Sequence, residues 1–228
     1  MAARFFGVTR NIAYWRKGDA IKTTTLSMII VLGVSLLGIA PAVHAEGEDA
    51  SESPKYFVIK GGRYSPSEKY AINDFNAGTT SHLDAKTGLN GELALGQYSD
   101  PELALELGIG YFESRAAPAG EPGSTRLKAV PIVITAKGFV PLGALQPYLE
   151  AGIGIYYTTL EVSGNTGGFS SQSKTTYGAH AGFGFDIDLS KKLFIGLEGR
   201  YLWVKPYYGG QPVKLDGFAT SINLGFRY

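Results

Sequence analysis

The chain of 228 residues contains no cysteine. That absence excludes disulfide bridges and thiolate metal sites, although by itself it assigns no cellular compartment. An excess of one charge is also missing, because 21 Lys and Arg stand against 20 Asp and Glu. A net charge of +1 gives no bulk electrostatic basis for a nucleic-acid partner. The sequence also has no metal-ligand spacing and no phosphate-binding loop. We therefore expect neither a metal nor a cofactor.

Only one long apolar run occurs, LSMIIVLGVSLLGI at 26–39, and it is shorter than the roughly 20 residues that a membrane-spanning helix needs. Basic residues precede the run, and PAVHAEGED follows it, with Val43 and Ala45 at the −3 and −1 positions of a signal-peptidase site. Together these are the three parts of a secretory signal. We predict a signal peptide over 1–45, cleaved near Ala45, and a flexible lead-in over 46–54. The alternative is an uncleaved anchor.

Glycine and aromatic residues are abundant, with 31 Gly, 14 Tyr and 12 Phe, which suits strands and turns rather than long helices. From residue 55 onward, apolar residues alternate with small or charged ones, as in LALELGIGY (103–111) and YLEAGIGIYY (148–157). Strict alternation is the signature of strands. We predict eight of them, near 55–64, 88–98, 103–114, 127–139, 146–158, 175–188, 193–204 and 218–228.

The connections between these runs alternate between long and short, as in an up-and-down barrel with long external loops and short periplasmic turns. Each run also has the length of about ten residues with which a tilted strand crosses a bilayer. The predicted fold class is therefore all-β, an eight-stranded antiparallel up-and-down transmembrane β-barrel over 55–228. A soluble periplasmic barrel with its apolar face inward is the alternative.

In a membrane barrel, one face of each strand meets lipid and the other faces a polar interior. Aromatic side chains then form belts at the two membrane interfaces. We expect an external belt of Tyr111, Tyr157, Tyr201 and Trp203, and a periplasmic belt of Tyr98, Phe139, Phe185, Phe226 and Tyr228. The opposite face carries mixed charges, for which we predict an interior charge network of Lys60, Glu92, Glu106, Lys137, Glu150, Glu198, Arg200 and Arg227.

Two interpretations of these charges stay open. They form either a gated ion path or a set of ion pairs that plugs the interior, and an eight-stranded interior is narrow enough to be filled by side chains. His180 is expected on the same face. A hydrolase would need a nucleophile and an acid beside it. We instead expect a hydrogen-bonded interior histidine and predict that the protein is not an enzyme.

The segments AVPIVITAKGFVP (129–141), LQPYLEAGIGIYY (145–157) and the terminal LGFRY resemble the small outer-membrane β-barrel superfamily of OmpA-, OmpX- and OmpW-like and opacity-type domains. The resemblance covers roughly 55–228. It implies residence in the outer membrane, contact with outer-membrane lipid and lipopolysaccharide, and a monomer. It also implies that the barrel-assembly machinery reads the C-terminal pattern of Leu224, Phe226 and Tyr228.

The resemblance leaves the activity open, because one fold supports many functions. The leading expectation is a structural or surface-interaction role through four external loops, with Phe169, Tyr207 and Tyr208 as candidate contacts. These aromatics could equally pack onto the rim of the barrel. The alternatives are a narrow channel for small or hydrophobic solutes and a lipid-modifying enzyme of the outer membrane.

Overall fold

The computed structural model describes residues 54–67, 70–74, 79–118, 123–164, 171–208 and 210–228. The predicted signal peptide over 1–45, nearly all of the lead-in and Phe169 lie outside these ranges. Within the ranges, no helix is long and apolar enough to cross a membrane.

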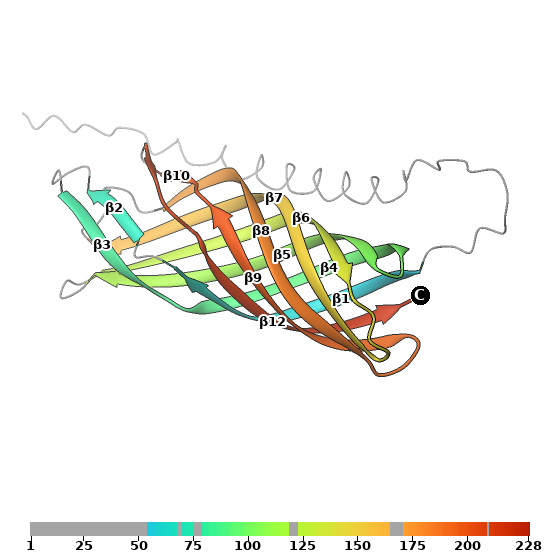
Figure 1. Cartoon of the computed structure of the whole chain (residues 1–228). Helices are drawn as coiled ribbons and strands as arrows, with labels where there is room; N and C mark the ends of the chain where they lie inside the picture. Colours follow the sequence, from blue (N-terminus) through green and yellow to red (C-terminus); the bar gives the residue numbers. More distant parts are fainter. Residues whose placement is uncertain (1–53, 68–69, 75–78, 119–122, 165–170, 209) are drawn as a thin grey trace, which may run out of the picture. The chain divides into compact units, whose positions relative to one another are not determined.

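Eight long strands form a closed antiparallel barrel, which confirms the predicted fold class (Figure 1). The first strand, β1, pairs with the last, β12, so the barrel wall has no open edge. The eight strands are β1 (Lys55–Pro66), β4 (Gly88–Asp100), β5 (Leu103–Pro118), β6 (Gly123–Phe139), β7 (Leu145–Gly164), β8 (Ser171–Asp188), β9 (Leu193–Val204) and β12 (Gly217–Arg227).

Four short strands lie within connections that the sequence predicts as loops. In the first connection, β2 (Tyr70–Asp74) pairs with β3 (Thr79–Lys86), and β3 also pairs with β5. In the last, β10 (Tyr207–Tyr208) pairs with β11 (Gln211–Pro212). Because β5 continues past the point where β4 begins, its backbone there needs another partner, and β3 supplies it.

The two ends of the barrel differ. We call the end with the long connections the loop end and the end with the short ones the turn end. Strands β5, β6, β7 and β8 are 16, 17, 20 and 18 residues long. Strands β1, β9 and β12 are shorter, with 12, 12 and 11 residues. About ten residues suffice to cross a bilayer. The longer strands, together with β3, therefore project as a ledge beyond one side of the barrel (Figure 1).

The outward face of the wall is apolar. Leu149, Ile153 and Ile222 are 71%, 69% and 67% exposed, and large hydrophobic side chains are exposed on each of the eight long strands. A soluble protein does not expose so continuous an apolar surface, whereas a membrane barrel requires one. The alternative of a soluble barrel with its apolar face inward is therefore wrong.

The predicted aromatic belts need one correction. Tyr111, Tyr157 and Trp203 lie outward near the loop end, and Phe226 and Tyr228 lie outward near the turn end. Tyr98 and Phe139, however, are buried inside the barrel. The alternation indicates the same placement. Tyr98 is an even number of residues from Glu92, and Phe139 is two residues from Lys137, so each lies on the inward face of its strand.

Two apolar clusters fill the interior near its ends. The turn-end cluster consists of Tyr56, Val58, Ala94, Tyr98, Ala104, Phe139, Tyr148 and Phe194. The larger loop-end cluster includes Tyr64, Phe112, Leu127, Tyr156, Leu160, Leu202, Tyr208 and Leu215. Large rings fit because glycines lie opposite them: a Cβ added to Gly96 would overlap the ring of Tyr56, and one added to Gly225 would overlap Phe194.

Candidate functional site

The candidate site is a group of charged side chains in the middle of the barrel, between the two apolar clusters. Its seven members come from six strands, and each side chain is at most 8% exposed. Their positions follow from the alternation, which turns the charged residues of every strand inward. We call this group the interior network: Lys60, Glu92, Glu106, Lys137, Glu150, Glu198 and Arg200.

Glu198 on β9 lies at the centre of the interior network. Its Oε2 accepts hydrogen bonds from Lys60 Nζ at 3.1 Å and from Lys137 Nζ at 3.4 Å. The hydroxyl of Tyr148 donates to the same oxygen at 3.1 Å, and Arg200 contacts the other oxygen. One carboxylate thus joins bases from three different strands across the interior.

Every base of the interior network contacts three carboxylates. Lys60 Nζ lies 2.9 Å from Glu92 and 3.2 Å from Glu106, in addition to Glu198. Arg200 donates to Glu92 at 2.8 Å and to Glu150 at 3.0 Å, and Lys137 contacts Glu106, Glu150 and Glu198. Burial of an ion is costly unless it is paired and hydrogen-bonded. The shared contacts therefore offset the burial of these groups and fix their side chains in place.

Arg227, the eighth predicted member, lies apart from the interior network. Its Nη1 donates to Asp188 Oδ1 at 2.6 Å near the turn end, and its guanidinium stacks over Phe194 at 4.6 Å. Arg227 is close to the C-terminal end of β12, so its level on the wall differs from that of the other charges. The alternation along β12 predicted the inward face for Arg227 correctly, but it could not predict which residues Arg227 contacts.

His180 is buried inside the barrel, and its Nε2 lies 3.0 Å from Thr135 Oγ1. Its Nδ1 has no hydrogen-bond partner among the described residues. A hydrolytic triad requires an acid that orients the imidazole through this second nitrogen. His180 therefore has the surroundings of a structural interior residue. No group of three or more metal-ligating side chains lies together in the described ranges.

Sequence reasoning missed that aromatic rings close the interior on both sides of the interior network. Along β1, the inward residues run from Tyr56 through Lys60 to Tyr64, which places the charges between the two apolar clusters. The rings are also in mutual contact, with centroids 5.1 Å apart for Tyr56 and Tyr98 and 4.6 Å apart for Tyr64 and Phe112. The available signal was their even spacing from the inward charged residues of the same strands.

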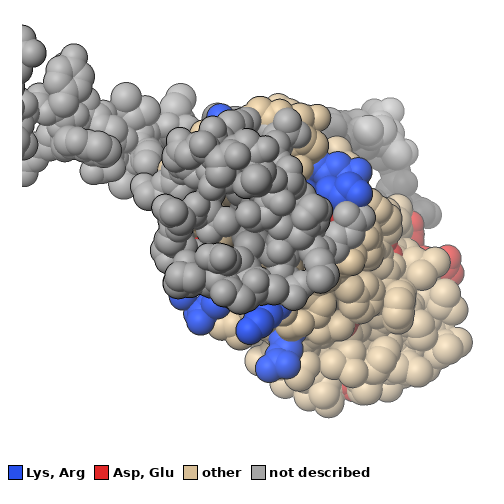
Figure 2. Space-filling view, turned by 90° about the vertical axis from the view of Figure 1, so that its left-hand side faces the viewer, with Lys and Arg blue, Asp and Glu red and all other residues tan. Residues whose placement is uncertain are grey.

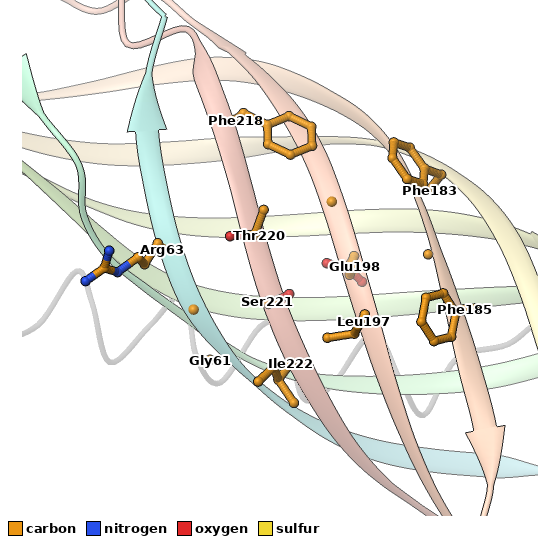
Figure 3. A pocket seen from close by; sticks show the side chains of 13 residues that line it. Gly61, Arg63, Phe183, Phe185, Leu197, Glu198, Phe218, Thr220, Ser221 and Ile222 are labelled. Atoms are coloured by element: carbon orange, nitrogen blue, oxygen red, sulfur yellow. The ribbon is translucent and has the colours of Figure 1, made fainter.

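A groove of about 460 Å³ lies on the outside of the wall, over β1, β12, β9 and β8 (Figure 3). Phe183 and Phe218 border it, and Gly199 and Thr220 form part of its floor. The strands beneath it are paired without interruption. The groove is therefore a depression in the apolar outer surface and does not open into the interior.

The predicted loop contacts differ in their surroundings. Tyr207 is 62% exposed beside the loop end. Tyr208 is buried, and its hydroxyl donates to Thr158 Oγ1 at 2.6 Å, so its prediction as an exposed contact is corrected. The short β10–β11 hairpin turns Tyr208 toward the barrel, and β10 follows a Pro206 break that the alternation of β9 could not anticipate. Phe169 lies outside the described residues.

The predicted assembly signal lies on β12 and just after it. Leu224, Phe226 and Tyr228 point outward and are 48%, 45% and 64% exposed. Gly225 and Asn223 alternate with them and face the interior. The backbone of Tyr228 also exchanges two hydrogen bonds with that of Lys55, so the pairing of β12 with β1 extends to this residue.

Several solved structures are similar to the chain, and the first of these shares its fold. OprG from Pseudomonas aeruginosa is 16% identical with a TM-score of 0.56, and the match covers 78% of this chain and 97% of OprG. Neisserial surface protein A is 16% identical over 79% of this chain and 98% of its own, with a TM-score of 0.45. The protease OmpT from Escherichia coli is 9% identical over 81% of this chain and 100% of its own, with a TM-score of 0.49.

One fold supports many functions, so the expectation that the chain is not an enzyme stays a prediction. No curated protein sequence matches the chain. A family model does: that of the outer membrane protein beta-barrel domain matches residues 32–228. The match covers most of the chain, so the protein belongs to the outer membrane protein beta-barrel domain family and is located in the outer membrane.

Proposed function

We propose that the protein is a closed structural barrel of the outer membrane that makes surface contacts through its loop end. The observation that carries this proposal is the filled interior. The interior network, with three bases each held by three carboxylates, lies between two packed clusters of aromatic and aliphatic side chains. An ion crossing the barrel would have to displace both buried rings and fixed ion pairs, which opposes conduction.

The loop end supports the interaction role. Outer-membrane barrels carry their long loops outside the cell, so the ledge and Tyr207 face the exterior. Exposed aromatic side chains on a rigid scaffold suit recognition of a partner. We propose that outer-membrane lipid, including lipopolysaccharide, surrounds a monomer. We also propose that the barrel-assembly machinery binds the outward pattern of Leu224, Phe226 and Tyr228.

Planar bilayers test the closed interior. The full mature chain is inserted after its heat-dependent gel shift shows that the barrel has folded. We expect no steady single-channel conductance. Steady conductance that changes in Glu106→Gln or Arg200→Ala would overturn the proposal, because it would show that ions pass the interior network.

The orientation has a clean test because the chain contains no cysteine. Tyr207→Cys on the loop end and Lys191→Cys in an exposed turn at the other end each introduce a single thiol. A membrane-impermeant maleimide added to intact cells should label Tyr207→Cys only. Labelling of Lys191→Cys alone would place the loop end in the periplasm and overturn the surface role.

A second candidate is a sideways route for small apolar solutes, and a gap in the wall favours it. Pairing between β5 and β6 runs to Ile109 and Ile132, stops, and resumes at Phe112 and Ala129. Pro131 lies in the gap and has no N–H with which to bond β5. The apolar loop-end cluster lies directly inside it. Uptake of a fluorescent apolar solute into vesicles, abolished by Pro131→Val, would support this route.

We further propose that the barrel has no enzymatic role. His180 lacks an orienting acid among the described residues. Mass spectra of outer-membrane lipids should be the same with and without overexpression of the protein. A new acyl loss or addition that depends on His180 would contradict this.

A further inference from the structure

Three basic residues lie side by side across adjacent strands of the ledge. Lys86 on β3 is the register partner of Arg115 on β5, and Arg115 is in turn the partner of Arg126 on β6. We call these three residues the basic row. Cross-strand partners place their Cβ atoms about 5 Å apart, and like charges at this spacing destabilise a sheet. The three like charges therefore repel one another, and an anionic ligand bound between them would remove this repulsion.

We propose that the basic row binds the phosphate groups of an anionic outer-leaflet lipid, a phosphorylated glycolipid. This inference rests on the proposed surface role and gives it a ligand class and a site. Guanidinium groups bind phosphate through paired hydrogen bonds, and lysine adds a point charge. Three such groups in one row match a headgroup that carries more than one phosphate.

The nearby carboxylates neutralise the basic row only in part. Glu113 accepts a hydrogen bond from the Tyr111 hydroxyl at 2.8 Å and contacts Arg115 at 3.5 Å. Glu161, the register partner of Arg126, instead pairs with Lys128 at 2.6 Å. Within the described part of the chain, neither Lys86 nor Arg126 forms an ion pair, and the side chain of Arg115 is 64% exposed. The row thus has cationic groups available to a ligand.

The position of the row on the wall points to a lipid rather than a soluble anion. Its side chains lie on the outward face, because their neighbours Ala116 and Leu127 are buried in the interior. Toward the turn end, the same face continues into exposed Tyr111 and Leu89, which belong to the apolar surface that lipid covers. The row therefore lies where this apolar surface ends, at the level of lipid headgroups.

The charge distribution around the loop end agrees with this position. Figure 2 views the barrel from that end, and Lys and Arg side chains gather along the edge of the visible wall, whereas few Asp or Glu side chains appear there. Basic side chains attract anionic headgroups that lie within about a Debye length, roughly 8 Å at physiological salt. The apolar groove of Figure 3 lies on another part of the wall and contributes no member of the row.

The test measures lipid binding to the full mature chain folded in detergent. The probes are diphosphoryl lipid A and its fully dephosphorylated form, and native mass spectrometry counts bound lipid. The row variant combines Lys86→Glu, Arg115→Glu and Arg126→Glu. Its matched control combines Lys55→Glu, Lys191→Glu and Lys192→Glu, which make the same charge change in exposed residues of the turn end. Gel shifts on heating establish that both are folded, and a triple alanine variant replaces the row variant if it does not fold.

We expect the wild type and the control to bind diphosphoryl lipid A at least about tenfold more tightly than the row variant, since each basic group near a charged headgroup contributes attraction. Dephosphorylated lipid A should bind all three chains equally weakly. Equal binding of the two lipids, or an equal loss in the control, would overturn the proposal.

A soluble probe separates the two sources of phosphate. Inositol hexaphosphate should bind the row more weakly than the lipid, because it lacks acyl chains for the apolar wall. If it binds as tightly, the assignment to a lipid is wrong. Conductance and maleimide labelling do not involve these three residues, so a failure of the proposed function is distinguishable from a failure of this inference.

Discussion

The guanidinium of Arg200 on β9 meets the carboxylate of Glu150 on β7 over Gly182, the β8 residue that lies between them in the register. Arg200 Nε is 3.0 Å from Glu150 Oε1, and Nη2 is 3.5 Å from Oε2. A side chain at the middle position would separate the two groups. The interior network therefore depends on a missing Cβ as well as on its charges.

Removal of the Arg200 charge should destabilise the barrel strongly. Arg200→Met keeps most of the side-chain volume but leaves Glu150 without its nearest base and takes one of two bases from Glu92. We expect a loss of about 3–5 kcal/mol in the free energy of unfolding, the usual result when one member of a buried ion pair is removed. Urea unfolding in detergent, followed by the fluorescence of Trp203, measures this loss.

Lys205→Met is the matched control. Lys205 is largely exposed and lies 3.9 Å from Asp216, so its removal should cost about 0–1 kcal/mol. Equal losses in the two variants would mean that the interior network contributes nothing beyond an ordinary surface pair.

Addition of a single methyl group at Gly182 should separate Arg200 from Glu150. A Cβ there would approach the Gly199 carbonyl and Arg200 too closely. We expect Gly182→Ala to reduce the free energy of unfolding by about 1–3 kcal/mol, the range for overpacking. The same urea titration applies, with Gly138→Ala as control, because nothing lies within 4 Å of a Cβ added to Gly138. A harmless Gly182→Ala would show that the wall adjusts without strain.

Replacement of Pro131 should close the gap between β5 and β6. Pro131→Val supplies the missing N–H, so the ladder can continue through Gly110 and Tyr111. We expect slower amide hydrogen exchange in a peptide covering 109–112, measured by mass spectrometry. Pro147→Val serves as the control, because β7 and β8 pair through Pro147 without interruption. Unchanged exchange in Pro131→Val would mean that proline does not cause the gap.

Alkaline pH should loosen the last connection at the loop end. Burial raises the pKa of Tyr208 to about 12, against an ordinary value of 10.0. Between these values the unfolded segment loses its proton while the folded one keeps it, so the folded form binds more protons. Its stability is therefore complete below pH 10 and falls as pH rises toward 12.

Limited proteolysis of the 205–216 segment between pH 9 and about 11 follows this loss. Tyr208→Phe should remove the part of the pH dependence that comes from this hydroxyl. Tyr207→Phe, at the exposed neighbour, should retain the wild-type dependence. The explanation fails if the Tyr208→Phe protein shows the same pH profile as the wild type.

The alternation of residues determined much of the structure by itself. Alternation is a local property of an extended backbone, so the faces of Glu106, Lys137 and Arg200 followed from counting along each strand. The same counting would have placed Tyr98 and Phe139 in the interior. These two residues were instead assigned to an aromatic belt, although their positions in the alternation indicated the interior.

Tertiary structure decided what depends on distance between strands. The contact of Lys60 with Glu198, for example, exists only because β1 pairs with β12 and β12 with β9 in the closed wall. Such partners depend on the register and stagger of the barrel. The pairing of β3 with the extended β5 creates the basic row, and it likewise depends on the fold because it joins two segments about thirty residues apart in the sequence. Alternation within a strand is repeated every two residues and can be read from one segment. Contacts across a barrel are fixed only when all eight strands close.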